Sequence, residues 1–372
     1  MRFSRPLRTI LTELSQSLNR SLIQQYLQPQ SLYQERNQTP ILFMHGFSSI
    51  KPINLIGYKL NFPFNTVNAV LGQLGYAVFT PSINAMDNAQ NRAALWADHL
   101  QQILDKTGAK QVHIIAHGQG AIDARILACS RASSCNNTQG QPFEGKGLSH
   151  KIASITSIAG PHLGTPILDH LEAKEDKAKL NDVIDFLALI NLCSIKTIKN
   201  AFENISSEYM LKEFNPCMKI PDSIPCFTIS AQPTENHLDK HCLYESWGQL
   251  KETASFDGGG ENDGLIPVNS AQFKGENTLL AGTQIRQWRH IGHVGADHFA
   301  LTGYHRKGDF EYLPFYVGLA QFTNPIVNSS QTMELLTNGQ WQRQPTPNEK
   351  TTTANDAKKS ARKTPTRKKV TP

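Results

Sequence analysis

The stretch Val112-His-Ile-Ile-Ala-His117-Gly118-Gln119-Gly120-Ala121 decides the fold. An apolar run ends in a short turn of small residues, and a helical pattern starts at once. This order is typical of a buried strand that leads through a nucleophile elbow, in which a strained turn projects one side chain over the edge of a sheet. Ala116 and Gly120 supply the small flanks that such a turn needs. The central position is Gly118, which has no side chain.

Further apolar runs alternate with helical patterns on both sides of this stretch. Strands are expected at 41–44, 77–80, 152–158 and 226–230, and helices at 91–106, 121–129 and over much of 167–214. Short buried strands that alternate with helices predict an α/β fold. Its central sheet is mostly parallel, and helices cover both faces.

Several segments carry a resemblance to one family. They are ILFMHGF (41–47), NLIGY (54–58), HIIAHGQG (113–120), SIAGPHLGT (157–165), ENDGLIPVNS (261–270) and ADHF (296–299). In this order they resemble the bacterial triacylglycerol lipases of the α/β-hydrolase fold, over about residues 40–320. The resemblance implies an α/β-hydrolase domain at 31–344, with a helical lid inserted at about 167–214, and a lipid ester as substrate.

Carried over position by position, the resemblance assigns a role to each site residue. Asp263 is the acid, His298 is the base, and the backbone N–H groups of Phe47 and Gln119 form the oxyanion hole. In such a triad the acid orients the histidine, which deprotonates a serine. The order of nucleophile, Asp and His fits this fold, but Gly118 stands where the serine belongs.

Alternatives remain open for the acid and the base. His290 and His293 lie close to His298 in the sequence, and the segment around His290 resembles another form of the family's ending. Asp263 precedes a glycine, so it also fits an ordinary Asp-Gly turn. Two further histidines, at positions 45 and 162, are expected to be structural.

The missing serine sets the functional expectation. Loss of the nucleophile of a triad lowers turnover by roughly a million-fold, and Ser48, Ser49 and Ser130 are badly placed to replace it. Glycine suits the strained turn, so the fold survives while the chemistry is lost. We therefore expect a lipase- or esterase-family protein that binds or acts on lipid esters with impaired acyl transfer. The alternative is a non-catalytic lipid-binding or regulatory interaction protein.

The sequence predicts neither a cofactor nor a metal site. None of the cysteines has the C-x-x-C spacing of a zinc site. The resemblance implies a calcium-binding aspartate near the base, but the matching position is Ala300 after His298 or Gly292 after His290, and Asn269 holds the position of a family disulfide. Cys217, Cys226 and Cys242 cluster in the sequence, so a disulfide among them is expected in an oxidising compartment, and free thiols otherwise.

The two ends differ from the body. Over 1–30, apolar residues recur at helical spacing and four arginines accompany one acidic residue. This pattern predicts an amphipathic helix that either contacts anionic lipid or packs on its own body. Residues 345–372 hold eight of the 37 basic residues and two of the 31 acidic ones, so the net charge of +6 lies in this tail. Its composition predicts disorder.

These patterns bear on partners and location. A body without excess positive charge argues against a specific nucleic-acid partner. No apolar run is long enough to cross a bilayer, and the N-terminal pattern lacks the continuous apolar block of a secretory signal. The expected location is therefore cytoplasmic, with peripheral membrane contact if the N-terminal helix is an anchor.

Overall fold

The computed structural model describes most of the predicted hydrolase domain. The described residues are 39–47, 53–55, 58–60, 64–130, 144–167, 187–188, 193–234, 243–252, 260–274, 288–303, 310–324 and 333–343. The predicted N-terminal helix (1–30), the basic tail (345–372) and most of the 182–195 part of the predicted lid lie outside them.

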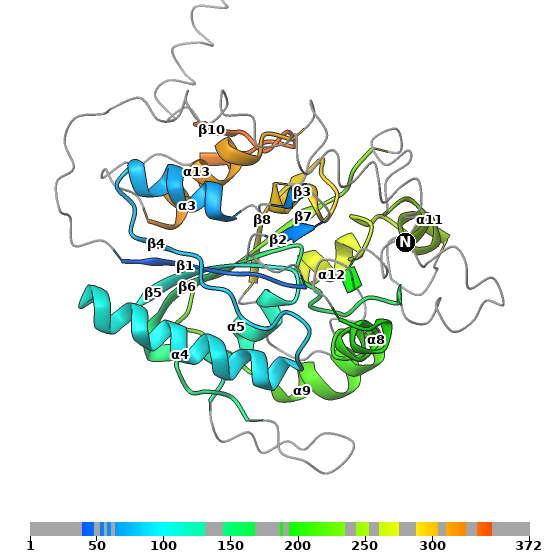
Figure 1. Ribbon diagram of the computed structural model, residues 1–372, viewed down its shortest axis with the longest axis horizontal. Coiled ribbons are helices and arrows are strands. Elements are labelled where there is room, and N and C mark those ends of the chain that lie inside the picture. Colours follow the sequence, from blue (N-terminus) through cyan, green and yellow to red (C-terminus); the bar gives the residue numbers. More distant parts are fainter. Residues whose placement is uncertain are drawn as a thin grey trace, which may run out of the picture.

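A six-stranded sheet in the order β4-β1-β5-β6-β7-β8 forms the centre of the molecule (Figure 1). Each neighbouring pair is parallel. The strands are β1 (Ile41–Met44), β4 (Val78–Phe79), β5 (Val112–His117), β6 (Ile152–Ile158), β7 (Cys226–Ala231) and β8 (Trp288–Val294). The predicted α/β architecture with a parallel sheet is confirmed.

The strand sequences explain the layers. In β1, Ile41 and Phe43 pack into the cluster beneath two helices, α3 (Phe64–Gln73) and α13 (Tyr312–Thr323). Leu42 and Met44 point to the opposite face, where α4 (Ala89–Thr107) and α5 (Gly120–Ala128) lie (Figure 1). All four side chains are buried. Because both faces of the sheet are covered, β1 is a continuous apolar run that does not alternate with polar residues.

The long helix α4 has clear start and stop signals. The Asn88 side chain accepts a hydrogen bond from the N–H of Asn91, which caps the first turn. Gly108 ends the helix with a φ of 69°, and its N–H donates to the carbonyl of Leu104. The predicted range of 91–106 was therefore two residues short at its start and one short at its end.

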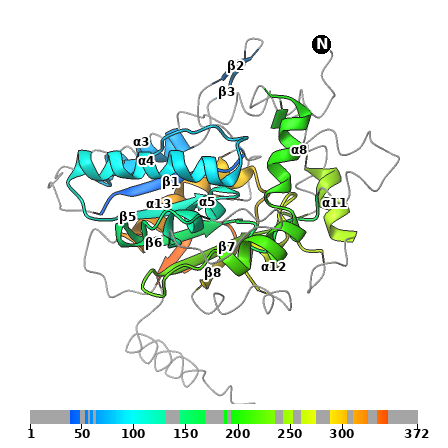
Figure 2. The same ribbon diagram turned by 90° about the horizontal axis from the view of Figure 1, so that it is seen from below.

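Shorter elements complete the described fold. They are α8 (Ile195–Glu203), the π-helix η2 (Tyr209–Phe214), α9 (Asn215–Cys217), α11 (Tyr244–Glu252), α12 (Val268–Gln272), and the 3-10 helices η1 (Ser149–Lys151) and η5 (Ala300–Thr302). Two hairpins pair β2 (Ile53–Leu55) with β3 (Tyr58–Leu60) and β9 (Met333–Leu335) with β10 (Trp341–Arg343). In Figure 2, α8 and α11 lie together at one side of the sheet. Phe202 of α8 contacts Phe47, just after β1, with ring centroids 4.7 Å apart, so this side is where the strands end.

The cysteines depart in part from the expectation of free thiols. Cys226 is free, as are Cys129 and Cys193. Cys217 is disulfide-bonded, and its partner lies outside the described residues. The sequence shows which cysteines are close along the chain but not which are close in space, so the pairing could not be predicted. Among the described helices, none is both long and apolar enough to cross a membrane.

Candidate active site

The turn after β5 has the geometry that its sequence predicts. Gly118 adopts a φ of 56°, a backbone conformation that costs other residues strain. Its N–H donates to the carbonyl of Ile158 at 3.0 Å, and its carbonyl accepts from the N–H of Ala121 at 3.0 Å. These bonds fix the central position of the turn between β6 and the start of α5.

The predicted acid lies in a second, tightly held turn. The Asp263 carboxylate accepts hydrogen bonds at Oδ1 from the N–H groups of Leu265 (3.0 Å) and Ile266 (2.7 Å). Gly264 supplies a φ of 98° within the turn, and its N–H donates to the Asn262 side chain at 2.8 Å. This Asp-Gly turn explains the local sequence, and it leaves the second carboxylate oxygen of Asp263 for another partner.

That partner is His298. The Nδ1–H of His298 donates to Oδ2 of Asp263 at 2.8 Å, and the His298 backbone N–H donates to the Asp263 carbonyl at 2.8 Å. The two residues are 7% and 1% exposed. Because the carboxylate holds the proton on Nδ1, the lone pair of the ring lies on Nε2, as a general base requires.

Nε2 of His298 faces Gly118. A Cβ atom built on Gly118 would lie 3.1 Å from this nitrogen, which is tighter than most real contacts of a Cβ. The structure therefore brings the predicted acid, base and nucleophile position together in one line.

The other two candidate bases lie elsewhere. On β8, Nδ1 of His290 bonds Oγ1 of Thr228 at 3.2 Å, and Nδ1 of His293 bonds Oγ of Ser230 at 2.8 Å. Both partners belong to β7. Of the three histidines, His298 alone bonds Asp263 within the described part of the chain.

The predicted oxyanion residues flank the same point. A Cβ on Gly46 would lie 3.1 Å from the backbone nitrogen of Gln119, so the turn that carries Phe47 lies against the start of α5. His45 braces this turn: its Nε2 accepts from the N–H of Ile83 at 3.2 Å, and its Nδ1–H donates to the Gly46 carbonyl at 2.9 Å. Burial lowers the pKa of His45 to about 3, so the ring stays neutral.

Sequence reasoning missed a buried ion pair behind this turn. Arg92 donates to Oδ2 of Asp123 from Nε at 2.9 Å and from Nη2 at 2.7 Å, and both side chains are fully buried. Arg92 also donates to the carbonyls of His45 and Ala85, each at 2.7 Å. The pair thus joins α4, α5 and the turn before Phe47. The sequence feature that could have indicated this ion pair is Asp123, the one aspartate within the mostly apolar segment 121–129.

A second feature that the sequence did not reveal is the contact between His117 and His298. Their ring centroids are 4.4 Å apart, and His117 is 2% exposed. Burial, reinforced by the charge of His298, places the pKa of His117 well below its usual value. The proposed base therefore has an uncharged neighbour, which adds no positive charge beside Nε2.

The residues around His298 do not fit a calcium ion. Ala300 has no side-chain oxygen, and Oδ1 of Asp297 accepts from the N–H groups of Phe299 and Ala300 at 2.8 and 2.9 Å. Over the described ranges, no group of three or more acidic, histidine or cysteine side chains is placed to hold a metal ion.

Curated relatives and solved structures support one family. A triacylglycerol lipase of Pseudomonas fragi is 26% identical over 145 residues, which are 39% of this chain and 42% of the relative. Triacylglycerol lipase 2 of Saccharomyces cerevisiae is 23% identical over 213 residues, or 56% of each chain. The matches thus span about half the length of these curated relatives. No family model matches the chain.

The solved structures extend the likeness to the whole fold. Lipase 1 from Pelosinus fermentans has a TM-score of 0.55 and 18% identity, over 78% of this chain and 100% of its own. The Staphylococcus hyicus lipase has a TM-score of 0.52 and 16% identity, over 78% of this chain and 97% of its own. The chain therefore has the α/β-hydrolase fold. Together with the curated relatives, this supports its membership of the lipase family.

Proposed function

We propose that the chain binds lipid esters at the Asp263–His298 site and that its acyl-transfer chemistry is impaired because Gly118 stands at the nucleophile position. One observation carries the proposal: a buried, hydrogen-bonded Asp–His pair is aimed at a residue without a side chain. An Asp–His pair of this kind acts as a general base, but the serine hydroxyl that it would activate is missing at position 118.

Without a hydroxyl at position 118, no acyl-enzyme forms there. The chemistry left to the pair is general-base catalysis on water: the water oxygen attacks the ester carbonyl as Nε2 of His298 takes its proton. The tetrahedral intermediate then expels the alcohol as Nε2 returns the proton to the leaving oxygen. The N–H groups of Phe47 and Gln119 would stabilise the oxyanion. This route, which forms no acyl-enzyme, lacks the positioned nucleophile that a serine provides, so it is slow.

A lipid ester is the proposed ligand because the site adjoins a large apolar cluster. Phe47, Phe202, Leu265, Ile266 and Phe299 all belong to this buried cluster at the end of the sheet. It begins at the proposed oxyanion turn and continues beneath α8. The curated relatives are named as triacylglycerol lipases, which favours a long acyl chain over a polar substrate.

A second candidate is a lipid-binding protein that performs no hydrolysis. The contact between Phe47 and Phe202 favours it, because α8 then covers the oxyanion turn in this conformation. In such a protein the apolar cluster binds acyl chains, and the Asp–His pair is a structural remnant.

The two functions are separated by assaying the native chain and a His298→Ala variant on p-nitrophenyl butyrate and laurate. An impaired hydrolase gives slow turnover that the variant loses, and it gives no initial burst because no acyl-enzyme accumulates. A pure binding protein gives equal background rates for both chains but still binds a non-hydrolysable ether analogue of a diacylglycerol. If neither chain binds the ether lipid, lipid binding is wrong. Turnover of ordinary lipase strength in the native chain contradicts impaired acyl transfer.

We also propose that residues 1–30 contact anionic lipid as an amphipathic helix, because apolar residues at helical spacing accompany four arginines. Deletion of these residues should abolish sedimentation with phosphatidylglycerol vesicles, whereas deletion of 345–372 serves as the matched control for loss of positive charge. Unchanged sedimentation after the first deletion contradicts the proposal. The cytoplasmic location stays a prediction.

A further inference from the structure

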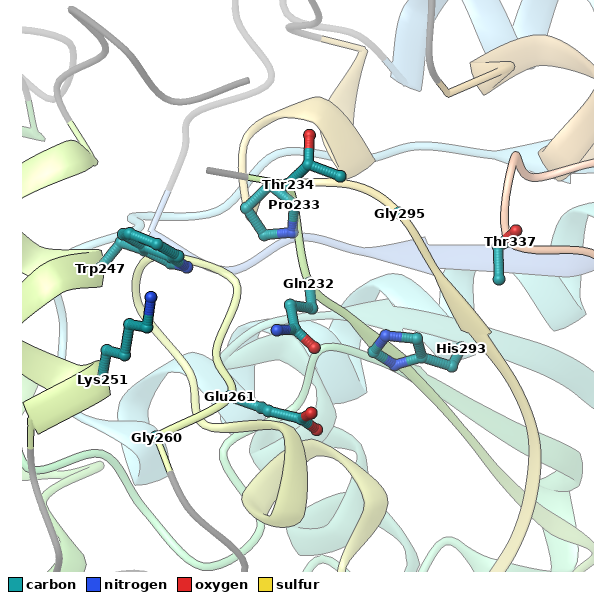
Figure 3. A pocket seen from close by; sticks show the side chains of 10 residues that line it. All are labelled: Gln232, Pro233, Thr234, Trp247, Lys251, Gly260, Glu261, His293, Gly295 and Thr337. Atoms are coloured by element: carbon teal, nitrogen blue, oxygen red, sulfur yellow. The ribbon is translucent and has the colours of Figure 1, made fainter. Parts of the chain in front are cut away.

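A cleft of about 720 Å³ lies beside the acid turn, within the roughly 300–1,000 Å³ range of small-molecule sites. Figure 3 shows side chains reaching it from α11, from the end of β7, from the turn before Asp263 and from β8. Glu261 precedes the proposed acid by two residues. The proposed function makes no use of this cleft.

Two polar side chains line the inner part of the cleft. Gln232 and His293 are half-buried there, and His293 points toward Gln232 in Figure 3. Within the described residues, the Gln232 amide makes no side-chain hydrogen bond to the protein, and His293 uses only Nδ1, toward Ser230. The Gln232 amide and Nε2 of His293 are therefore accessible to a hydrogen-bonding ligand, which would take the place of water at these atoms.

The rim carries two charges of opposite sign, on Lys251 and Glu261. Lys251 and Trp247 are four residues apart on one face of α11, and Nζ of Lys251 lies 4.7 Å from the centre of the Trp247 ring. This contact places the ammonium group at the rim of the cleft. The Glu261 carboxylate lies across the cleft and acts electrostatically on His293 (Figure 3).

The His293 imidazole adds no further charge to the cleft. Burial lowers the pKa of His293, although the carboxylate of Glu261 opposes the shift. With this ring neutral and the two rim charges cancelling, the described lining residues carry no net charge. An anion would meet Glu261, a cation would meet Lys251, and an apolar ligand would leave the Gln232 amide unpaired.

We propose that this cleft binds the polyhydroxylated face of an uncharged sugar. Each sugar hydroxyl both donates and accepts a hydrogen bond, which matches a lining that offers a cationic donor, a carboxylate acceptor, and an amide and an imidazole that do both. The exposed hydroxyls of Thr234 and Thr337 extend the same pattern along the rim. The sugar is either a free saccharide or the head group of a glycolipid. Binding does not depend on ester hydrolysis.

Saturation-transfer NMR on the full chain tests the proposal, with a panel of free hexoses and hexose disaccharides as probes. We expect transfer to the ring protons of at least one sugar. The affinity should be about tenfold weaker in Gln232→Ala, which removes the amide, and in Glu261→Gln, which replaces a charged acceptor with a weaker neutral one. Gln102→Ala is the matched control: this glutamine lines a separate cleft beside α4, and its substitution should leave the affinity unchanged.

A second arm separates the sources of the sugar. Phosphatidylcholine vesicles with and without a galactosyl diacylglycerol are sedimented with the native chain and with Gln232→Ala. Glycolipid-dependent sedimentation that Gln232→Ala loses identifies a head group, whereas binding of free sugars alone identifies a saccharide. The proposal is overturned if no probe binds in either arm, or if Gln232→Ala binds as the native chain does. Because neither arm reads ester hydrolysis, this failure is distinct from a failure of the proposed function.

Discussion

Gly118 and Gly120 of the elbow are two residues apart, but the surroundings of their Cβ positions differ. A Cβ on Gly120 would lie 2.5 Å from the carbonyl oxygen of Met44, so close packing of α5 on β1 excludes any side chain there. Gly118 instead faces His298, and the tightest approach to its Cβ is a side-chain nitrogen. A side chain at position 120 would therefore overlap backbone atoms, whereas one at position 118 would meet only the His298 ring but would have to adopt a strained φ of 56°.

Gly120→Ala should therefore destabilise the fold by about 2 kcal/mol or more, because the new methyl group overlaps the backbone of β1. Gly72→Ala is the matched control: it lies in α3 with no atom within 4 Å of its Cβ position, and we expect a gain of about 0.5–1 kcal/mol from helix propensity. Urea unfolding measures both. Equal stability of the two variants contradicts the packing argument.

At the scale of elements, the sequence predicts what is buried and apolar. The strand at 152–158 is predicted with its observed bounds, and β1 likewise, because continuous apolar runs are typical of strands covered on both faces. β8 is missed: the segment Trp288-Arg-His-Ile-Gly-His-Val mixes polar residues and a glycine, and it forms the edge of the sheet, where burial is partial. α3 and α13 are also absent from the prediction.

In the candidate site, too, the sequence predicts features that depend on a short local segment but not contacts between distant residues. Asp263 and His298, which the structure brings together, are predicted from local motifs, because each lies in a short segment that resembles a family segment. The Arg92–Asp123 pair joins two helices across 31 residues of sequence, and no local pattern reports such a contact. The choice among His290, His293 and His298 likewise needs the pairing of β7 with β8, which a single sequence does not give.

Arg92→Met should cost about 3–5 kcal/mol of stability, because it leaves the fully buried Asp123 carboxylate without its counter-ion. The double variant Arg92→Met with Asp123→Leu should recover most of this loss, since it removes both charges. Thermal unfolding measures the two effects. A double variant as unstable as Arg92→Met would show that the carbonyl contacts of Arg92, and not its charge pairing, dominate.

At the scale of the whole molecule, buried neutral histidines make the fold sensitive to acid. Burial lowers the pKa of His45 to about 3 and those of His113 and His290 to about 4. His117 and His162 are shifted in the same direction. Below about pH 6.5 the unfolded chain therefore binds more protons than the native chain, and stability falls as the pH falls.

We expect the free energy of unfolding to decline from about pH 6.5 down to about pH 4, by up to about 1.4 kcal/mol per pH unit for each such histidine. Burial raises the pKa of Asp123, which acts in the opposite sense but is one group against several. Urea midpoints across this range measure the slope. His113→Gln should make the slope of the unfolding free energy against pH shallower by the contribution of one bound proton. An unfolding free energy that stays constant or rises on acidification contradicts this expectation.

The central claim is that one absent hydroxyl separates this chain from an active lipase-type hydrolase, and the hydrolysis of p-nitrophenyl butyrate by a Gly118→Ser variant tests it most directly. The serine must fit a φ of 56° and displace His298 slightly, so recovery is partial. We predict a gain of at least about a thousand-fold over the native chain, which His298→Ala added to the same variant abolishes. A Gly118→Ser variant that folds but hydrolyses the ester no faster than the native chain would contradict the claim.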